Sequence, residues 1–272
     1  MLLANRVALV TGGAKGMGRS IALKFAQEGC DVAVNALNLE GAQKVADEIK
    51  ALGRRSLAIS ADISNSAAVQ EMVDQIIREF GKIDILVNNA GRITGNEGTI
   101  DTVTEESWDR VLSVNLKGAF LVCKAVVPHM KEQRYGKIIN ISSMGAVNPS
   151  VSVLHYHSAK AGMLGLTINL AFELAPYNIY VNSIVPGPIE TPFWDPLTKS
   201  MSAEEREAFF TALSKKEVPL GRMGTPEDIA GPALFLASSL SDYVTGQHIC
   251  VAGGQPLHAQ EATFIAEAIT KI

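Results

Sequence analysis

The feature that most constrains this chain is the regular alternation of short apolar runs with longer stretches of helical spacing. The run Val7-Ala8-Leu9-Val10 has the length of a buried strand, whereas Val69, Met72, Val73 and Ile76 repeat at the spacing of one helix face. Strands that alternate with helices pair in parallel, and the helices cover both faces of the sheet. The pattern predicts strands over 6–11, 32–34, 57–59, 83–88, 137–142, 180–185 and 248–251. It predicts helices over 17–28, 42–49, 69–80, 105–131, 156–175 and 226–237.

These elements predict the α/β fold class, as a single-domain doubly wound (Rossmann) fold with a parallel β-sheet flanked by helices on both faces. We expect this domain over residues 1–255, because the length suits one α/β unit and no Gly/Ser linker divides it, and a helical tail over 256–272. Ligands of such folds bind beyond the carboxyl ends of the strands. The least regular stretch, about 188–220, is interpreted either as a pair of surface helices or as a mobile loop over the substrate.

Composition narrows the classes of partner. The chain is 47% hydrophobic and 19% charged, with a net charge of -4, and it contains no basic block of the kind that binds nucleic acid. Its apolar runs are shorter than a membrane span, and Arg6 interrupts the apolar start that a signal peptide would need. We therefore expect a cytoplasmic protein with a small-molecule substrate and no nucleic-acid or membrane partner. The scattered histidines and cysteines predict no metal site.

A glycine-rich turn follows the first predicted strand and opens the first predicted helix, with the sequence Thr11-Gly12-Gly13-Ala14-Lys15-Gly16-Met17-Gly18. Glycine lets the backbone turn sharply and approach a pyrophosphate, whose charge is favoured by a helix N-terminus. The spacing of Gly12, Gly16 and Gly18 differs from the G-x-G-x-x-G arrangement of other dinucleotide-binding folds. It resembles the TGxxxGxG motif of the short-chain dehydrogenase/reductase (SDR) family.

The resemblance extends over nearly the whole chain, from about residue 6 to residue 254. Asn88-Asn89-Ala90-Gly91 is similar to the family's NNAG motif, and Pro186-Gly187 with Thr191 is similar to its PGxxxT stretch beside the nicotinamide. The resemblance implies an NAD(P)(H) cofactor. The residues expected to contact it are Gly12, Lys15, Gly16, Met17, Gly18, Asn35, Ala36, Asp62, Ile63, Asn89, Ala90, Gly91, Tyr156, Lys160, Pro186, Gly187, Ile189 and Thr191.

Tyr156 and Lys160 lie four residues apart, which places both side chains on one face of a helix. A free tyrosine has a pKa of about 10 and gives up its proton poorly at neutral pH. A nearby positive charge favours the phenolate and lowers that pKa. Lys160 supplies one such charge, and an oxidised nicotinamide would supply another. The phenol would then serve as an acid in reduction and as a base in oxidation.

The resemblance implies two further catalytic residues and a second duty for the lysine. The family's catalytic serine lies thirteen residues before the tyrosine, which corresponds to Ser143 and leaves Ser142 as a structural neighbour. Its hydroxyl donates to the substrate oxygen, where charge develops. The family's asparagine corresponds to Asn115, where it holds a water that connects the lysine to solvent, and Lys160 also anchors the nicotinamide ribose. The expected catalytic set is Ser143, Tyr156, Lys160 and Asn115.

The position that commonly carries an acid in NAD-dependent enzymes is occupied here by Ala36. Such an acid accepts a hydrogen bond from the ribose 2′-hydroxyl and repels a 2′-phosphate. Lys15, just before Gly16, would attract that phosphate. We therefore expect a modest preference for NADP(H) over NAD(H).

The expected function is NAD(P)(H)-dependent interconversion of a secondary alcohol and a ketone, as in a 3-oxoacyl thioester reductase or another carbonyl reductase or alcohol dehydrogenase. Two alternatives are an SDR-type enoyl reductase, which usually alters the tyrosine–lysine spacing, and a non-catalytic dinucleotide-binding sensor, which loses a catalytic side chain. This chain keeps the usual tyrosine–lysine spacing and all four expected catalytic side chains. The resemblance implies a homotetramer or homodimer, because members of the family usually form one of these assemblies.

The substrate is not determined by these motifs. Segments 92–98, 148–154 and 192–220 are expected to line its pocket, with apolar side chains such as Val147 and Leu154 beside the polar Arg92. His155 and His157 flank the tyrosine. They are interpreted either as contacts for a polar substrate or as two partly exposed imidazoles at a helix start.

Overall fold

One parallel sheet forms the centre of the computed structural model, which describes residues 1–93, 98–150 and 153–255. Within this part the strands are β1 (Val7–Thr11), β2 (Asp31–Ala36), β3 (Ser56–Ser60), β4 (Ile85–Asn88), β5 (Gly136–Ile141), β6 (Ile179–Pro186) and β7 (His248–Val251). Their order is β3-β2-β1-β4-β5-β6-β7, and every adjacent pair is parallel. The order reverses between β1 and β4, where doubly wound sheets bind ligands. The predicted fold class is confirmed, and the predicted tail at 256–272 lies outside the described residues.

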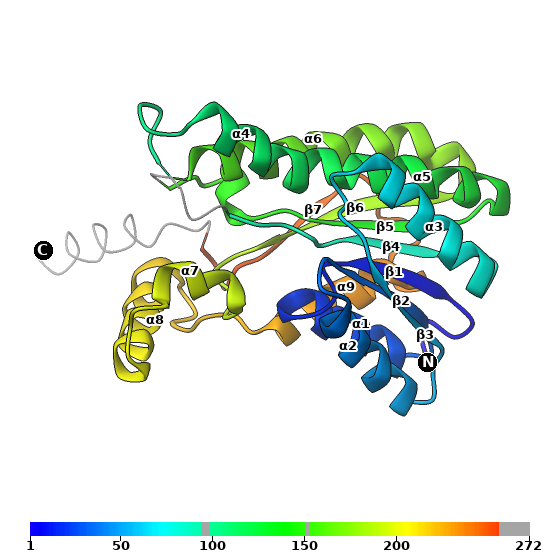
Figure 1. Cartoon of the computed structure of the whole chain (residues 1–272), viewed down its shortest axis with the longest axis horizontal. Coiled ribbons are helices and arrows are strands. Elements are labelled where there is room, and N and C mark those ends of the chain that lie inside the picture. Colours follow the sequence, from blue (N-terminus) through cyan, green and yellow to red (C-terminus); the bar gives the residue numbers. More distant parts are fainter. Residues whose placement is uncertain (94–97, 151–152, 256–272) are drawn as a thin grey trace, which may run out of the picture.

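Helices cover both faces of the sheet (Figure 1). One layer contains α1 (Gly16–Gln27), α2 (Leu39–Ala51) and α9 (Pro226–Ala237), and the opposite layer contains α3 (Ser66–Phe80), α4 (Glu105–Leu112), α5 (Ala119–Gln133) and α6 (Leu154–Leu174). Two further helices, α7 (Asp195–Thr198) and α8 (Ala203–Glu217), stand apart at the carboxyl end of the sheet. The stretch 188–220 therefore does contain a helix pair.

Alternating side chains of the buried strands supply a separate core to each layer. On β1, Ala8 and Val10 join the core packed by α1, α2 and α9, whereas Val7 and Leu9 join the core packed by α3, α5 and α6. Because both faces are covered, the strand is apolar from Val7 to Val10, and its one polar residue is the terminal Thr11. This explains why continuous apolar runs, and not alternating ones, identify the strands of this chain.

The helix predicted over 105–131 contains a π-helical turn, Ser113–Gly118, which joins α4 to α5. Within the described residues, this 105–133 stretch alone has the length and apolar composition to cross a membrane. Core helices meet the same criteria. Here Val122, Val126 and Met130 are buried in the core shared with α3 and α6, so α5 belongs to the layer that covers the sheet.

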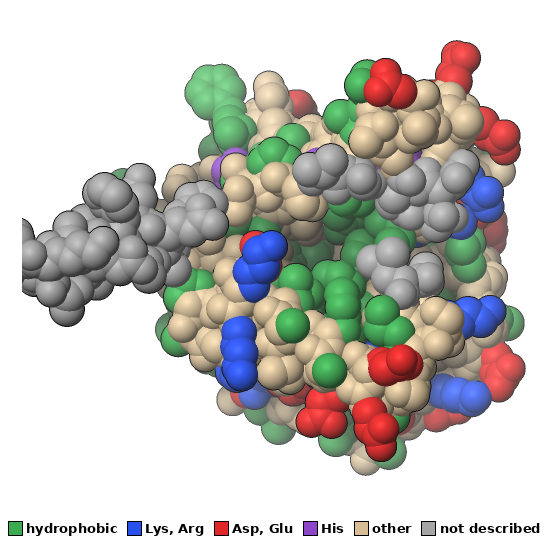
Figure 2. Space-filling view, turned by 90° about the vertical axis from the view of Figure 1, so that its left-hand side faces the viewer, with side chains coloured by type: hydrophobic (Ala, Val, Ile, Leu, Met, Phe, Trp, Pro, Cys, Tyr) green, Lys and Arg blue, Asp and Glu red, His purple; other side chains and the backbone are tan. Residues whose placement is uncertain are grey.

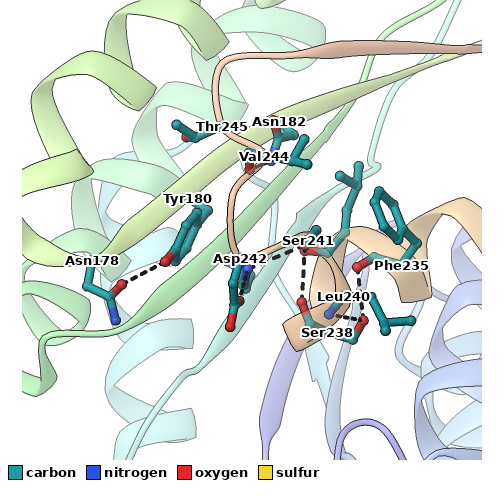
Figure 3. Close-up of polar contacts among 12 residues, drawn as sticks. Asn178, Tyr180, Asn182, Phe235, Ser238, Leu240, Ser241, Asp242, Val244 and Thr245 are labelled. Atoms are coloured by element: carbon teal, nitrogen blue, oxygen red, sulfur yellow. Dashed lines mark hydrogen bonds and ion pairs between the residues drawn. The ribbon is translucent and has the colours of Figure 1, made fainter.

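A buried lysine joins the sheet to the turn between α9 and β7, at the amino ends of β5 and β6. Figure 3 shows Ser241 and Asp242 of this turn, with Tyr180 and its hydrogen bond to Asn178. The Lys137 side chain is completely buried, and its Nζ lies 2.7 Å from the Asp242 carboxylate and 3.3 Å from the Ser241 hydroxyl. The ammonium also lies 3.7 Å from the ring centre of Tyr180, whose hydroxyl donates to Asn178 at 2.8 Å. Burial lowers the pKa of Lys137, and the Asp242 carboxylate opposes this shift. The carboxylate therefore keeps the buried ammonium charged and fastens the turn to both strands.

We expect Asp242→Ala to lower the free energy of unfolding by about 1–3 kcal/mol, because it leaves a buried ammonium without its anion. Urea denaturation followed by circular dichroism measures the change. Glu173→Ala is the matched control, because Glu173 pairs with Lys131 at 3.2 Å on the surface and its loss should cost about 0.5 kcal/mol or less. Equal losses in the two variants would contradict the anchoring role of Asp242.

Candidate active site

Close backbone approaches shape the glycine turn between β1 and α1. Gly12 and Gly16 have φ angles of 63° and 55°, in the left-handed region that favours glycine. A Cβ atom on Gly12 would lie 2.8 Å from the Cα of Ala90, and one on Gly18 would overlap the carbonyl oxygen of Gly12. The turn therefore packs against the chain that follows β4, and a side chain at these glycines would separate the two.

The N-terminus of α1 presents backbone N–H groups that no side chain of the described part caps. Side-chain oxygens cap α2, α3, α4, α8 and α9, whereas α5, α6 and α7 also begin without a side-chain cap. Uncapped N–H groups at the positive end of a helix dipole attract anions. A dinucleotide pyrophosphate fits this end, because the glycines allow close approach. Met17 is half-buried here and packs on the core with its side chain.

Asn89 and Thr11 hold the ends of β4 and β1 together. The Asn89 amide donates to the carbonyl oxygens of Thr11 at 2.9 Å and Gly12 at 3.1 Å. The Thr11 hydroxyl accepts from the N–H groups of Asn89 and Ala90, both at 3.1 Å. Asn89 thus supports the glycine turn from behind, and its amide nitrogen is occupied by the protein.

The part of the candidate site that would receive the adenosine of a dinucleotide lies beside the carboxyl end of β2. Asn35 is buried, and its amide donates to the carbonyl oxygens of Ile59 at 3.4 Å and Ala61 at 3.1 Å. Its side chain therefore joins β2 to the end of β3 and to the residue that follows it. Ala36 is half-buried at the end of β2, and Lys15 is exposed at the N-terminus of α1.

Asp62 and Ile63 follow β3 on the same edge. Asp62 is exposed, and one of its carboxylate oxygens accepts from the N–H group of Ser64 at 2.9 Å and from its hydroxyl at 2.7 Å. Ile63 is buried, and a Cβ atom on Gly118 would lie 2.7 Å from its Cδ1. Ile63 therefore packs against the π-helical turn that carries Asn115.

The loop after β6 reaches across to the glycine turn. Pro186 ends β6, Gly187 and the buried Ile189 follow, and a Cβ atom on Gly16 would lie 3.3 Å from the Thr191 Cγ2. The loops after β1, β4 and β6 therefore surround one region at the carboxyl edge. Figure 2 shows a hollow on this end of the molecule, with hydrophobic side chains gathered in it.

Asn115 is completely buried in the π-helical turn, a local widening that often occurs at functional sites. Its amide donates to the carbonyl oxygens of Arg92 at 2.8 Å and Val111 at 3.0 Å, and its Oδ1 accepts from the Arg92 N–H group at 3.2 Å. A Cβ atom on Gly91 would lie 2.7 Å from that oxygen and 3.3 Å from the Lys160 Nζ. Asn115 and Lys160 thus meet at Gly91.

Lys160 is 3% exposed, and its Nζ donates to the carbonyl oxygen of Ile141 at 2.8 Å. Burial lowers the pKa of Lys160 to about 8. The Ser142 hydroxyl donates to the backbone carbonyl oxygen of Lys160 at 2.8 Å. Ser142 therefore fastens α6 to β5, as expected of a structural neighbour.

Tyr156 lies between Ser143 and Lys160, with its ring centre 5.7 Å from the Lys160 Nζ. Burial raises the pKa of Tyr156 to about 12, and a hydrogen bond with Ser143 opposes this shift. The expected lowering by Lys160 is therefore not found in the protein alone. Burial disfavours the phenolate, and the Lys160 ammonium donates to the Ile141 carbonyl.

The two histidines beside the tyrosine differ from each other. His155 is completely buried, with Nε2 3.2 Å from the Ser107 hydroxyl on α4, so it is not a partly exposed imidazole. His157 is half-buried and packs against Gly145, and its pKa is lowered by burial and by His155. His155 joins α6 to α4, whereas His157 lines the same side as Tyr156, with their ring centres 5.9 Å apart.

Known proteins resemble this chain over most of its length. A model of the family described as enoyl-(acyl carrier protein) reductase matches residues 12–255. The (2S)-[(R)-hydroxy(phenyl)methyl]succinyl-CoA dehydrogenase subunit BbsD of Thauera aromatica is 45% identical over 95% of this chain and 100% of its own length. The 3-oxoacyl-[acyl-carrier-protein] reductase FabG of Thermotoga maritima is 41% identical over 93% and 99%.

Solved structures agree. A short-chain type dehydrogenase/reductase from Mycobacterium marinum superposes with a TM-score of 0.85 at 38% identity, covering 93% of this chain and 96% of its own. The chain belongs to the short-chain dehydrogenase/reductase family. Levodione reductase superposes with a TM-score of 0.88 at 32% identity, covering 94% and 99%. As an SDR protein the chain is an oxidoreductase that acts on alcohol and carbonyl groups with a nicotinamide dinucleotide.

Two contacts of this SDR site were not foreseen from the sequence. The backbone carbonyl oxygen of Ile141 accepts from Lys160. Every residue has such a carbonyl, so the residue type does not indicate which one a lysine will contact. Phe193 places its ring centre 5.6 Å from that of Tyr156. The aromatic residues of the 188–220 stretch were a visible signal, but their pairing with the tyrosine depends on the tertiary fold.

We expect Gly91→Ala to lower kcat about 10- to 100-fold, because the added methyl group displaces Asn115 and Lys160. Steady-state kinetics with a saturating dinucleotide measures the change. Gly165→Ala is the control, because a Cβ atom there meets nothing within 4 Å. A Gly91→Ala enzyme with the kcat of the control would refute the positioning role of this glycine.

Proposed function

We propose that this SDR enzyme interconverts a secondary alcohol and a ketone of an acyl thioester, with Tyr156 as the general acid and base. The observation that carries the proposal is the arrangement around that phenol. Its hydroxyl shares a hydrogen bond with Ser143, and its ring lies 5.7 Å from the Lys160 ammonium. Asn115 meets the same lysine at Gly91. The four residues are the proposed catalytic set.

The nicotinamide dinucleotide supplies or takes up the hydride. In reduction, the carbonyl carbon would gain that hydride as the C=O π bond opens, and the oxygen would take the proton of Tyr156. The single Ser143 O–H, which bonds with the phenol in the free protein, would turn to donate to the same substrate oxygen. A phenol with a pKa of about 12 carries its proton at neutral pH, so it is ready to act as the acid. In oxidation the phenol must first lose that proton, which requires additional positive charge nearby.

Lys160 is proposed to serve two purposes. Its pKa of about 8 leaves it mostly protonated at neutral pH, but in the protein alone it does not lower the pKa of Tyr156. Its ammonium is proposed to favour the phenolate only once cofactor and substrate are bound. It is also proposed to donate to the ribose of a bound dinucleotide. Asn115 positions the chain at Arg92 and is proposed to hold the water that connects Lys160 to solvent.

The proposed cofactor contacts cluster into three groups. The glycine turn and α1 would receive the pyrophosphate, the ends of β2 and β3 the adenosine, and the loops after β4 and β6 the nicotinamide ribose and ring. Within the second group, Asn35 is proposed to act by shaping the strand end, because its amide is occupied by Ile59 and Ala61.

The thioester class is supported by the relatives. The Thauera protein is named for a succinyl-CoA derivative, and the Thermotoga protein for a 3-oxoacyl chain on acyl carrier protein. Reduction of a carbon–carbon double bond is the second candidate, because the matching family model carries the name of an enoyl reductase. Tyr156 hydrogen-bonded to Ser143 favours the carbonyl reaction, since this pair donates to an oxygen at the reacting centre.

We also propose a cytoplasmic homotetramer or homodimer. The support is a set of apolar side chains exposed on α5 and α6, where Phe120 is 46%, Ile168 52% and Phe172 88% exposed. Exposed apolar clusters commonly mark contacts between subunits. Light scattering of the purified protein tests the subunit number.

We expect Tyr156→Phe to bind the dinucleotide as the wild type does and to lose about 10²-fold or more of its turnover of a 3-oxoacyl thioester. Absorbance at the reduced-nicotinamide band measures turnover, and fluorescence titration measures binding. The same assay is run with an enoyl thioester, which the wild type should leave unreduced. Substantial activity in the variant, or faster reduction of the enoyl substrate, would overturn the proposed function.

The cofactor preference is proposed to be NADP(H), since Ala36 places no carboxylate at the end of β2 and Lys15 is exposed beside the glycine turn. We expect Ala36→Asp to reduce the ratio of kcat/KM for NADPH over NADH by about tenfold or more, through repulsion of the 2′-phosphate. Lys15→Ala should reduce the same ratio, and Lys44→Ala, in an exposed pair with Glu40, should not. A clear wild-type preference for NADH would refute this choice.

A further inference from the structure

The catalytic phenol is covered on one side by an aromatic wall. Phe193 lies in the short 3₁₀ turn Pro192–Trp194 after β6, and its ring is tilted 46° to that of Tyr156 with the centres 5.6 Å apart. Rings at this separation are in contact. Phe193 is only half-buried, so part of the residue remains accessible.

The wall is fixed from behind. Trp194 meets Phe193 edge-on with centres 6.2 Å apart, and Trp194 in turn contacts Phe209 at 6.3 Å and Phe210 at 5.9 Å on α8. The Trp194 indole N–H donates to the carbonyl oxygen of Ile189 at 2.8 Å. Four aromatic rings therefore connect α8 to the phenol and to the loop after β6, which holds Phe193 in one place.

The reaction geometry brings the substrate against this wall. A substrate oxygen that takes the Tyr156 proton lies about 2.7 Å from the phenol oxygen, and the reacting carbon is one bond further. A substituent on that carbon can therefore reach the Phe193 ring when it points to this side of Tyr156, because the two ring centres are only 5.6 Å apart. Hydrophobic side chains gather in the hollow at this end of the molecule (Figure 2). An apolar, flat substituent fits such a wall, because aromatic rings gain from edge and offset contacts beyond simple burial.

We propose that Phe193 is a specificity-determining residue that selects substrates with an aryl group on the carbon that bears the oxygen. The inference rests on the proposed function for the identity of the reacting carbon. The substrate class is thus an aryl ketone, or the matching benzylic alcohol, carried on a thioester. The Phe193 ring contacts the aryl group, and Tyr156 exchanges the proton with the oxygen.

The test compares two thioesters that differ only at this substituent, the N-acetylcysteamine esters of 3-oxo-3-phenylpropionate and 3-oxohexanoate. The wild type is expected to have the higher kcat/KM for the phenyl substrate. In Phe193→Leu the phenyl-to-propyl ratio of kcat/KM should fall about tenfold, mainly through KM, because the ring contact is lost. Phe193→Tyr keeps a ring and should retain most of the ratio. Tyr243→Leu is the matched control on the exposed surface and should leave activity and ratio unchanged.

A ratio that stays unchanged in Phe193→Leu overturns the proposal, as does an equal rise in activity toward both substrates, which would make Phe193 an obstruction. Should Phe193→Leu fail to fold, Phe193→Tyr and Phe193→Val are compared instead. With an unchanged Tm, Phe193→Tyr should keep the wild-type phenyl-to-propyl ratio, and Phe193→Val should lose it. Dissociation constants of both thioesters for dinucleotide-loaded Tyr156→Phe, with and without Phe193→Leu, separate the two levels of inference. If the phenyl thioester binds more tightly because of Phe193 but the wild type turns over neither thioester, the aryl contact is supported and the proposed reaction is refuted. If the wild type turns over the thioesters but the ratio does not depend on Phe193, the reaction is supported and the aryl contact is refuted.

Discussion

The site depends on the direct contact between the turn after β1 and the chain after β4. Asn89 donates to the carbonyl oxygens of Thr11 and Gly12, and the Thr11 hydroxyl accepts from the two N–H groups that follow β4. These bonds satisfy backbone groups at a place where the strand order reverses and the sheet ladder ends. The glycines allow the approach, and it directs the uncapped end of α1 toward one side and Gly91 toward Asn115 and Lys160 on the other.

Burial sets the resting protonation of the two central groups. It raises the pKa of Tyr156 and lowers that of Lys160, in each case toward the uncharged form. The raised pKa of Tyr156 opposes oxidation more than the lowered pKa of Lys160 does, because in oxidation the phenol must lose its proton and become a buried anion. Ser143 lowers that cost through its hydrogen bond, and a positive charge brought in with an oxidised dinucleotide would lower it further. We therefore propose that the cofactor and the phenol of this SDR site depend on each other.

The opposite end of the sheet contains a second buried ammonium with a different task. Lys137 is neutralised by Asp242 and covered by Tyr180, and it fastens the turn between α9 and β7. Since β7 pairs with β6, and the loop after β6 carries Gly187, Thr191 and Phe193, this anchor fixes the strand from which the substrate side of the site extends. The chain thus buries one lysine at each end of the sheet, Lys137 beside Asp242 and Lys160 beside Tyr156.

The sequence by itself determined the order of strands and helices along the chain and the position of the glycine turn, because short periodic patterns and fixed spacings depend only on neighbours along the chain. With the family resemblance it also led to the prediction that Ser143, Tyr156, Lys160 and Asn115 form the catalytic set. It did not show the π-helical turn around Asn115, the burial of His155 or the committed amide of Asn35, since each depends on a hydrogen bond to a distant segment. The direction of the Tyr156 pKa and the ring contact with Phe193 were likewise decided by the tertiary structure. Solvent exclusion and contact across the sheet edge arise only when the loops after β5 and β6 meet, and no local pattern encodes the distance between them.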